Sequence, residues 1–389
     1  MTRPVTRESR ERKLPRDIPI DGSGSASPGA ALPDLALKGR GAVSNRPGRY
    51  EPGNRPLEDD GWGHEPGEDD DLPPLRTTVT IDATRSAIAW NESPDLGFDR
   101  SLNPYRGCEH GCIYCFARPT HAYLGLSPGL DFETKLLAKP EAPRLLAEEL
   151  SRPSYKPAPI GLGTNTDPYQ PIEREMRITR GVLEVLAAFN HPVTIVTKSV
   201  LVTRDIDILA EMASKSLAHV SISVTTLDKH LARKMEPRAP TPPRRLDAMR
   251  RLAEAGIPVG VMAAPMIPAL NDMELEAILS AAAKAGASGA SYVLLRLPLE
   301  IKDLFAEWLE AHAPGKARHV QSLIAGARRG SHYVDEFGER MRGHGPYAEL
   351  LAKRFRLAVK RCGLERRGWD LRTDLFQVPP KKGDQLCLL

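Results

Sequence analysis

Short strand-like runs of apolar residues recur along this chain about every 25–40 residues, and helix-like segments separate them. This spacing is typical of βα units, in which parallel strands form one sheet and the intervening helices cover it. With one strand just before a cysteine-rich segment at 108–115, the sequence contains six units. They predict an α/β fold, a partial (β/α)6 barrel of the TIM type, with its site at the carboxyl ends of the strands. The strands predicted after that segment are Pro159–Gly163, Val193–Thr197, His219–Thr225, Pro258–Ala264 and Tyr292–Leu297.

Two segments between these strands carry the helical period most clearly. Apolar residues at one-face spacing follow Thr203 and, later, the pair Asn271-Asp272, which is typical of a helix N-cap. The sequence therefore predicts helices over 206–213 and 275–282.

One predicted strand, His219–Thr225, alternates between apolar and polar residues. Strands buried on both faces are usually apolar throughout. A polar face on this strand therefore predicts a wet or ligand-binding interior on one side of the sheet.

The chain is predicted to have three parts. Residues 1–75 are rich in Pro, Gly, Ser and charge, so they cannot bury enough apolar surface to fold and are expected to form a disordered tail. Residues 76–298 form the barrel core and begin with a short strand at 77–81. Residues 299–389 form a helical extension that includes a helix over 347–362.

Composition predicts a cytoplasmic protein with no membrane contact. No run of 18 or more apolar residues occurs, and the N-terminus lacks the apolar stretch of a secretory signal. Three of the five cysteines lie within eight positions, which differs from the spread of a disulfide framework. Between residues 351 and 372, eight Lys and Arg stand against two acidic residues. This excess fits either a nucleic-acid backbone or a solvated helix face.

The cysteines Cys108, Cys112 and Cys115 have the spacing C-x3-C-x2-C. Soft thiolates suit an iron–sulfur cluster, and the two glycines in the segment let the chain wrap closely around one. Three ligands leave one iron of a cubane free to bind a small molecule. Cys362 and Cys387 are distant in sequence.

Two other readings of the cysteines stay open. A structural zinc site would use them with His110 or His121, although structural zinc usually takes two separated pairs of ligands. A cluster used only for electron transfer would normally have a fourth protein ligand.

The cysteine spacing, with a tyrosine before the third cysteine and a βα barrel after it, resembles the radical S-adenosylmethionine (SAM) superfamily. Over residues 95–300 the sequence looks most like the branch of spore photoproduct lyase and its "DNA repair photolyase-like" relatives. The runs that carry this resemblance are Asn103–Cys108, Thr164–Glu173, Thr197–Ser199, Arg204–Asp207 and Ser221–Thr225.

The resemblance implies a [4Fe–4S] cluster on the three cysteines and SAM bound to the open iron. It implies that one electron, from a donor of the flavodoxin or ferredoxin type, cleaves SAM to a 5′-deoxyadenosyl radical that abstracts hydrogen from a substrate. Further roles are implied at matching positions: Tyr114 against the adenine, Lys198 on the SAM carboxylate, and Ser223 or Ser221 at the ribose.

The resemblance also places a polar motif for the methionine amine after the second strand, where this chain has Thr164, Asn165 and Thr166 in place of the common Gly-Gly-Glu. Arg238 is a further candidate for binding a carboxylate or phosphate, and Asp167 a supporting partner. His344 and Tyr347 are candidates for the substrate side. No catalytic residue is assigned.

Three hypotheses for the function follow. The first is a lyase-like or repair-like radical SAM enzyme that acts on a nucleic acid, although neither Cys362 nor Cys387 matches the hydrogen-donating cysteine of that branch. The second is a radical SAM enzyme for a peptide or small molecule. The third is a non-catalytic metal-binding or electron-transfer protein.

Overall fold

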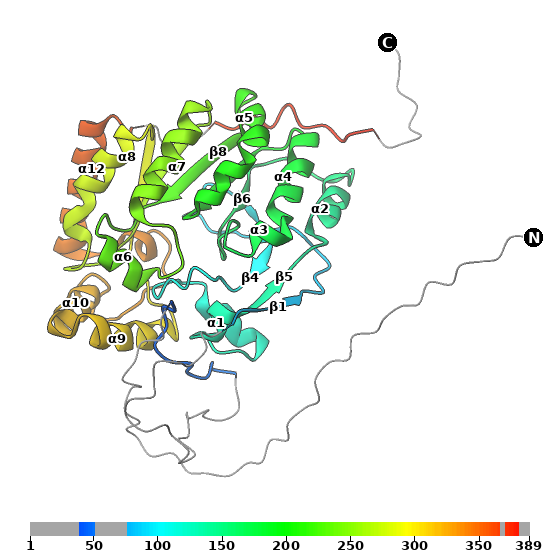
Figure 1. Ribbon diagram of the computed structural model, residues 1–389. Coiled ribbons are helices and arrows are strands. Elements are labelled where there is room, and N and C mark those ends of the chain that lie inside the picture. The colour runs from blue at the N-terminus through cyan, green and yellow to red at the C-terminus, as the bar shows by residue number, and fades with distance from the viewer. Residues whose placement is uncertain (1–38, 51–75, 366–369, 381–389) are drawn as a thin grey trace, which may run out of the picture. The chain divides into compact units, whose positions relative to one another are not determined.

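A computed structural model describes residues 39–50, 76–365 and 370–380, all within one compact unit of the chain (Figure 1). Within these residues, seven strands form a sheet in the order β10-β9-β8-β7-β6-β3-β2. All neighbouring pairs are parallel except β2 with β3. The strands are β2 (Ala89–Trp90), β3 (Arg100–Leu102), β6 (Ile160–Leu162), β7 (Val193–Thr197), β8 (Ala218–Ser223), β9 (Val259–Met266) and β10 (Gly289–Leu294).

The six parallel strands lie in chain order, which confirms the α/β class and the predicted sequence of βα units. Each connection between consecutive parallel strands therefore leads to the neighbouring strand of the sheet. That this sheet curves into a partial barrel stays a prediction. The run expected to begin the core forms β1 (Thr78–Ile81), which pairs with β5 (Lys135–Ala138) in a separate small sheet with β4 (Tyr105–Arg106).

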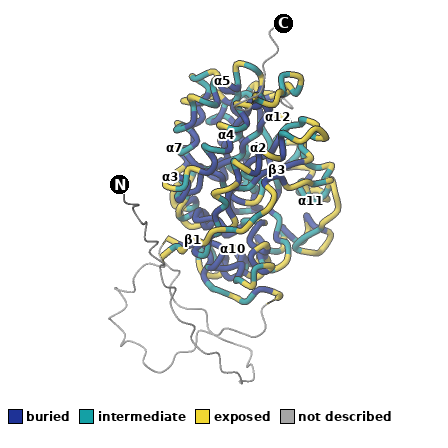
Figure 2. The backbone as a smooth tube through the Cα atoms, turned by 90° about the vertical axis from the view of Figure 1, so that its right-hand side faces the viewer, coloured by how far each residue is buried: buried dark blue, intermediate teal, exposed yellow. Residues whose placement is uncertain are grey.

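Helices follow the strands and pack against the sheet and one another (Figure 1). They are α1 (Asp131–Thr134), α2 (Ala142–Leu150), α3 (Glu173–Met176), α4 (Ile178–Ala188), α5 (Ile206–Ser214), α6 (Lys229–Met235), α7 (Pro242–Glu254) and α8 (Leu275–Lys284). The predicted helices at 206–213 and 275–282 are thus confirmed as α5 and α8. Apolar side chains from these helices and from the strands form the largest core cluster, and Figure 2 shows the buried segments running through the centre.

Asn271 is not the cap that its place before α8 suggests. Its side chain makes no capping hydrogen bond. The buried amide instead accepts a hydrogen bond from the Ile267 backbone N–H and donates to the Thr225 carbonyl. Asn271 therefore joins the chain segments that leave β8 and β9.

The C-terminal extension consists of α9 (Ile301–His312), α10 (Pro314–Gly326), α11 (Glu339–Arg342) and α12 (Gly345–Cys362). Helices α9 and α10 share an apolar cluster with Cys112, Ile113 and Tyr114. Helix α12 packs on α8 and β10, and Glu365, just beyond it, bridges to Gly289 at the start of β10. Helix α12 therefore runs from the carboxyl end of the strands to their amino end. No helix in the described part of the chain has the length and apolar character needed to cross a membrane.

Candidate active site

The three cysteines lie on one loop that follows β4. The Cys108 backbone N–H donates to the Phe132 carbonyl at 2.9 Å, and the Cys115 N–H donates to the Cys112 carbonyl at 3.1 Å. Gly107 and Gly111 have φ of +76° and +66°, a conformation that side chains with a Cβ rarely adopt. The glycines thus let the loop fold back on itself between the cysteines. Cys108 and Cys112 are buried, and Cys115 is half-buried.

The chemistry of this loop fits an iron–sulfur cluster. All three thiols are free, and one short loop presents them together. Burial raises the pKa of Cys108, and it raises the pKa of Cys112 to about 12, with the charge of Lys198 opposing the rise at Cys112. A bound metal deprotonates such thiols, because the thiolate is the ligand.

The two histidines considered for a zinc site have other partners. The ring of His110 lies 3.3 Å from the Asp167 carboxylate, and the ring of His121 contacts the Lys135 carbonyl at 2.9 Å. Among the residues that the structure describes, no three His, Cys, Asp or Glu side chains converge on a single metal ion. The cysteines of a cubane each bind a different iron, so a cluster does not require the three thiols to meet at one point.

A buried ion pair between Arg118 and Glu133 is bonded to the backbone of the cysteine loop. Arg118 is fully buried and donates to the carbonyls of Cys112 and Gly111 at 2.9 and 3.1 Å, and its guanidinium pairs with Glu133. The Glu133 carboxylate also accepts the backbone N–H groups of Gly41 and Ala42 at 3.0 and 2.8 Å. A loop whose carbonyls accept hydrogen bonds from a fixed guanidinium is held in one conformation.

Residues 39–50 therefore depart from the expectation of a disordered tail over 1–75. Arg40, Gly41, Ala42 and Val43 are buried against the cysteine loop. A Cβ on Gly41 would lie 1.7 Å from the Gly111 carbonyl oxygen, so the two backbones are in direct contact. This short segment is stabilised by hydrogen bonds from the backbone of Gly41 and Ala42 to the Glu133 carboxylate. Because Glu133 is distant in sequence, local composition does not reveal the contact. The remainder of the expected tail lies outside the described residues.

The segment after β6 carries the candidates for the methionine amine. Thr164 exchanges hydrogen bonds with the Asn103 side chain at 2.9 and 3.2 Å, and Thr166 donates to the Tyr105 carbonyl at 3.3 Å. The Asn165 backbone N–H is bonded to Asn103, whereas its exposed side chain has no hydrogen bond among the described residues. Of the three, Asn165 keeps a polar side chain available for a ligand.

Asp167 links three parts of the site. Its carboxylate accepts hydrogen bonds from the Thr197 hydroxyl at 2.6 Å and the Lys198 backbone N–H at 2.8 Å, and it faces His110. Burial alone would raise the pKa of Asp167, but its interaction with the His110 ring and its hydrogen bonds lower it to about 2. The carboxylate therefore stays charged and fixes the end of β7 relative to the cysteine loop.

Lys198 follows β7, and its ammonium points toward the cysteine loop. The Nζ atom lies 5.7 Å from the centre of the Tyr114 ring. It makes no hydrogen bond or ion pair within residues 39–50, 76–365 and 370–380. Burial would lower the pKa of Lys198, but attraction to Cys112 and Glu236 raises it. The site thus contains a charged ammonium without a contacting carboxylate.

A second buried network surrounds Tyr114. The tyrosine hydroxyl donates to Glu236 and lies 3.1 Å from the Thr225 hydroxyl, and Glu236 is paired with Arg245. Burial would raise the pKa of Glu236, but Arg245 and Lys198 lower it to about 2. The hydroxyl of Tyr114 is thus anchored at the end of β8, which leaves its ring beside Lys198.

Some of the remaining predicted site residues lie near the cysteine loop, and others lie elsewhere in the fold. Ser221 and Ser223 lie on β8, half-buried and buried respectively. Arg238 pairs with Glu109 of the cysteine loop at 3.0 Å, so it has a carboxylate partner already. The hydroxyl of Tyr347 donates to Asp272 at 2.8 Å, and the exposed His344 precedes α12. Cys362 ends α12, near the amino end of β10, and Cys387 lies outside the described residues.

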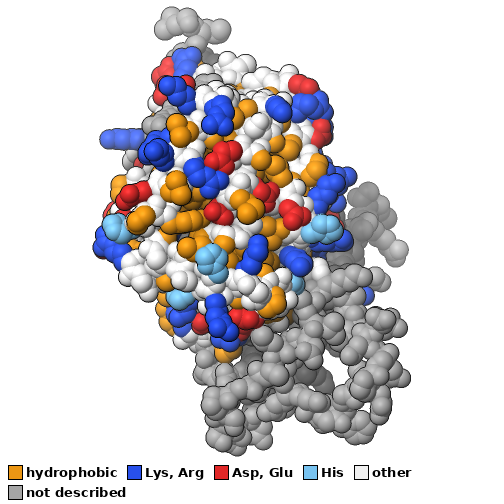
Figure 3. Space-filling model, turned by 90° about the vertical axis from the view of Figure 1, so that its left-hand side faces the viewer, with side chains coloured by type: hydrophobic (Ala, Val, Ile, Leu, Met, Phe, Trp, Pro, Cys, Tyr) orange, Lys and Arg blue, Asp and Glu red, His pale blue; other side chains and the backbone are white. Residues whose placement is uncertain are grey.

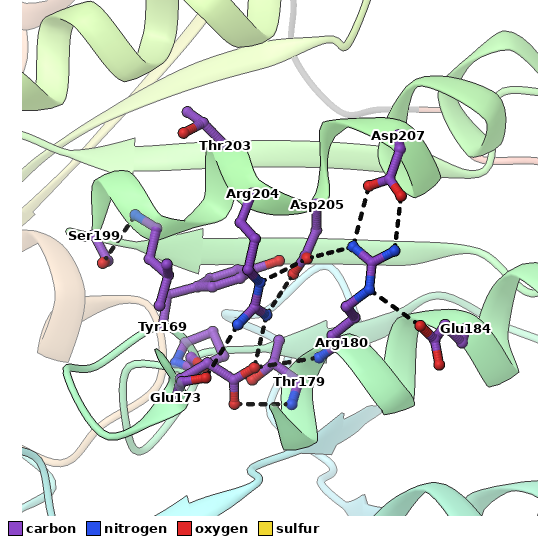
Figure 4. Close-up of polar contacts among 12 residues, drawn as sticks. Tyr169, Glu173, Thr179, Arg180, Glu184, Ser199, Thr203, Arg204, Asp205 and Asp207 are labelled. Carbon is purple, nitrogen blue, oxygen red and sulfur yellow. Dashed lines mark hydrogen bonds and ion pairs between the residues drawn. The ribbon is translucent and has the colours of Figure 1, made fainter. Parts of the chain in front are cut away.

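Charged residues from two of the resembling runs form a network away from the thiols (Figure 4). Arg204 pairs with Glu173 and Asp205, both at 2.8 Å, and Arg180 pairs with Asp205 and Asp207 at 2.9 and 2.7 Å. Glu173 also accepts a hydrogen bond from the Tyr105 hydroxyl, three residues before Cys108. These residues therefore connect the cysteine segment to the connections after β6 and β7.

The basic residues of α12 do not gather at the site. Arg354 pairs with Glu276 at 2.7 Å, and Lys353, Arg356, Lys360 and Arg361 are divided along a helix that runs toward the amino end of the strands. Figure 3, which views the side of the molecule that carries α8, α10 and α12, shows Lys and Arg interspersed with Asp and Glu. The charge on this face is mixed.

Comparisons with known proteins identify the family of this chain. The model of the radical SAM superfamily matches residues 102–282. An uncharacterised protein of Mycobacterium tuberculosis is 38% identical over 285 residues, which cover 72% of this chain and 82% of that protein. The chain belongs to the radical SAM superfamily. An uncharacterised protein of Methanocaldococcus jannaschii is 28% identical over 200 residues, 51% of this chain and 73% of that protein.

Solved radical SAM structures share the fold. A spore photoproduct lyase variant with bound AdoMet and dinucleoside spore photoproduct matches with a TM-score of 0.51 and 15% identity, covering 73% of this chain and 78% of that one. The Y98F variant of the same enzyme matches with a TM-score of 0.51 and 16% identity, covering 74% and 79%. As a radical SAM protein, the chain has a [4Fe–4S] cluster and SAM as its cofactors, and it needs an external one-electron donor.

Sequence reasoning missed several residues that shape this radical SAM site. Asn103 begins one of the runs that carry the resemblance and Glu236 lies in none of them, and the importance of both comes from contacts with Thr164 and Arg245. Glu133 has no local signal, because its partners Arg118 and Gly41 come from separate segments. Glu236 directly follows α6 after Arg233, Lys234 and Met235, so its local sequence gives no sign that it is buried.

Proposed function

We propose that this radical SAM enzyme reductively cleaves SAM on a cluster held by Cys108, Cys112 and Cys115, and abstracts hydrogen from a nucleic-acid substrate in a lyase-like reaction. The observation that supports the site assignment best is Lys198. Its charged ammonium lies beside the cysteine loop without a contacting carboxylate among the described residues. An ammonium in such a place, with no carboxylate in contact, is free to pair with an anionic ligand.

The proposed roles of the other residues follow from their positions. Lys198 binds the SAM carboxylate, and the free side chain of Asn165 binds the amine together with Thr164 or Thr166. The ring of Tyr114, anchored through its hydroxyl, lies against the adenine, and Ser223 or Ser221 contacts the ribose. Arg238 is assigned a positioning role, since it holds the cysteine loop through Glu109.

When bound, the cluster and SAM supply a 5′-deoxyadenosyl radical, and the chain holds both in place and excludes water from it. Arg118 and Glu133 fix the backbone between the thiols, and residues 39–43 cover that side of the loop. Asp167 fixes Lys198 through the lysine backbone N–H, so the ammonium is positioned before SAM arrives.

The experiment that tests the cofactor assignment is the Cys112→Ala variant, with Cys362→Ala as the matched control. Under anaerobic conditions with a reductant, wild type and Cys362→Ala are expected to carry iron and release 5′-deoxyadenosine from SAM. Cys112→Ala loses one of three cluster ligands, so iron content and 5′-deoxyadenosine should both fall to background. A Cys112→Ala protein that retains both would contradict the assignment of this cysteine.

The substrate class is tested separately. Salt-dependent retention on single- or double-stranded DNA or RNA is expected for a nucleic-acid enzyme, because phosphate contacts release counterions. A peptide or small molecule is the second candidate, and absence of nucleic-acid binding at low salt would favour it. The position of Cys362 far from the thiols supports no hydrogen-donating role for that cysteine.

A further inference from the structure

Arg296 is a second cation near the cysteine loop that has no contacting carboxylate among the described residues. Arg296 follows β10 in an extended segment, between Leu295 and Leu297. Those two leucines are buried in the apolar cluster that contains Cys112 and Tyr114. Arg296 is only half-buried and projects away from that cluster, so its guanidinium reaches the ring of Phe116, 4.3 Å away.

Arg296 makes no hydrogen bond or ion pair within the part of the chain that the structure describes. Its arginine neighbours are engaged: Arg340 pairs with Asp95 at 2.6 Å, and Arg328 donates to the carbonyls of Leu294 and Leu295. Burial lowers the pKa of Arg296, with Arg340 adding to the effect, and that of Arg328 falls to about 10 because of burial and the charge of Arg296. Positive charge is therefore in excess at the end of β10.

The position of Arg296 connects this charge to the reaction site. Phe116, on which it stacks, follows Cys115 directly, and 43% of its surface is exposed. A guanidinium stacked on an aromatic ring presents its N–H edge to an oxyanion, while the exposed part of the ring can stack with a base.

We propose that Arg296, supported by Phe116, binds a phosphodiester of a nucleic-acid substrate and so determines which substrate lies beside the cluster. This inference rests on the proposed function and names the group that the substrate presents. A phosphodiester fits better than a carboxylate because a guanidinium stacked on a partly exposed aromatic ring can meet a phosphate while the exposed part of the ring meets the adjoining base.

The experiment compares two probes on the cluster-loaded enzyme with SAM under anaerobic conditions. One is the thymidine dinucleotide with its natural phosphodiester, and the other is the same dinucleotide with a neutral methylphosphonate. Wild type is expected to bind the phosphodiester about tenfold more tightly, as a charge-assisted hydrogen bond implies. Arg296→Gln should bind the two probes equally. Arg296→Lys should recover part of the difference in affinity, because lysine keeps the positive charge but lacks the parallel N–H donors of the guanidinium.

The matched control is Arg356→Gln, which removes one positive charge from the exposed surface of α12. It should keep the tenfold preference, because a dinucleotide at the cysteine loop does not reach that helix. Iron content and thermal unfolding verify that each variant is folded. A wild type without preference, a wild type that binds neither probe, or a preference that persists in Arg296→Gln would overturn the inference. Release of 5′-deoxyadenosine by the wild type is measured in parallel, so failure of this inference is distinguished from failure of the proposed function.

Discussion

Two sets of charged residues in this molecule differ in how their charges are satisfied. In the network of Figure 4, Arg204 and Arg180 are surrounded by carboxylates, and the buried Glu173 and Asp205 each contact at least one guanidinium. At the cysteine loop, Lys198 and Arg296 have aromatic neighbours but no contacting carboxylate among the described residues. Both sets belong to connections that leave the carboxyl ends of the parallel strands.

The difference separates architecture from ligand binding. A buried charge whose partners are all present stabilises one arrangement of the chain, and removal of one partner leaves the others uncompensated. A charge without a partner contributes little to folding and is retained for something that binds. The comparison therefore predicts opposite consequences for substitutions in the two sets, on stability in the first and on ligand binding in the second.

The largest effect is expected for Glu173→Gln. This substitution removes the negative charge that pairs with Arg204 and accepts hydrogen bonds from the Tyr105 hydroxyl and the Thr179 N–H. The free energy of unfolding should fall by about 3 kcal/mol, as it does when one partner of a buried ion pair is removed. Urea unfolding of the purified protein measures the change.

Glu184→Gln is the matched control within the same network. Glu184 pairs with Arg180 at 3.1 Å, but its side chain is 58% exposed. Solvent screens such a pair, so the free energy of unfolding should change by about 0.5 kcal/mol or less. Equal effects of the two substitutions would contradict the view that burial makes the network architectural.

The fold was more accessible to sequence reasoning than this division of charges. Strand positions could be predicted because short runs of β-branched residues between helix-like segments, such as Val193–Thr197, are typical of strands. The cysteine loop could be located because its ligands are adjacent in sequence. The packing of residues 39–50 could not, since it depends on Glu133, more than 90 residues away.

Contacts between residues far apart in sequence also decide which site residues could be assigned a role from sequence alone. Lys198 follows β7 and Arg238 follows α6, and the local sequence does not tell their roles apart. Yet Arg238 is paired with Glu109, whereas Lys198 has no contacting carboxylate in the described residues. Arg296 gave no signal at all, because an arginine after a strand is common. What distinguishes these residues is the presence or absence of a partner from another segment, and only the tertiary structure supplies it.

A second prediction concerns Glu236, which lies between the two sets because it pairs with Arg245 and also attracts Lys198. Folding lowers the pKa of this carboxyl from about 4.5 to about 2. Its charged form therefore favours the folded state. The contribution, about 3 kcal/mol, is complete above pH 4.5 and is lost as the pH falls toward 2.

The measurement is urea unfolding of cluster-free protein at several pH values between 5 and 3, for wild type and Glu236→Gln. The stability advantage of wild type should be greatest at pH 5 and should shrink as the pH falls. Glu254→Gln, on the exposed pair with Arg250, is the control and should follow the wild-type curve. A difference between wild type and Glu236→Gln that is constant over this range would show that the carboxyl is not the titrating group.

The smallest effect on folding, and the sharpest on function, is expected for Lys198→Met. Because the ammonium has no contacting carboxylate to lose, the substitution should change the free energy of unfolding by less than about 1 kcal/mol. Loss of a charged hydrogen bond to the SAM carboxylate should weaken SAM binding by about tenfold to a hundredfold, measured as the KM for SAM in anaerobic 5′-deoxyadenosine release. Lys215→Met, from a surface pair with Glu211, is the control. If Lys198→Met instead lost stability and kept its KM for SAM, Lys198 would belong with the charges that stabilise the fold. A lack of contacting carboxylates could then no longer be used to identify ligand-binding cations in this site.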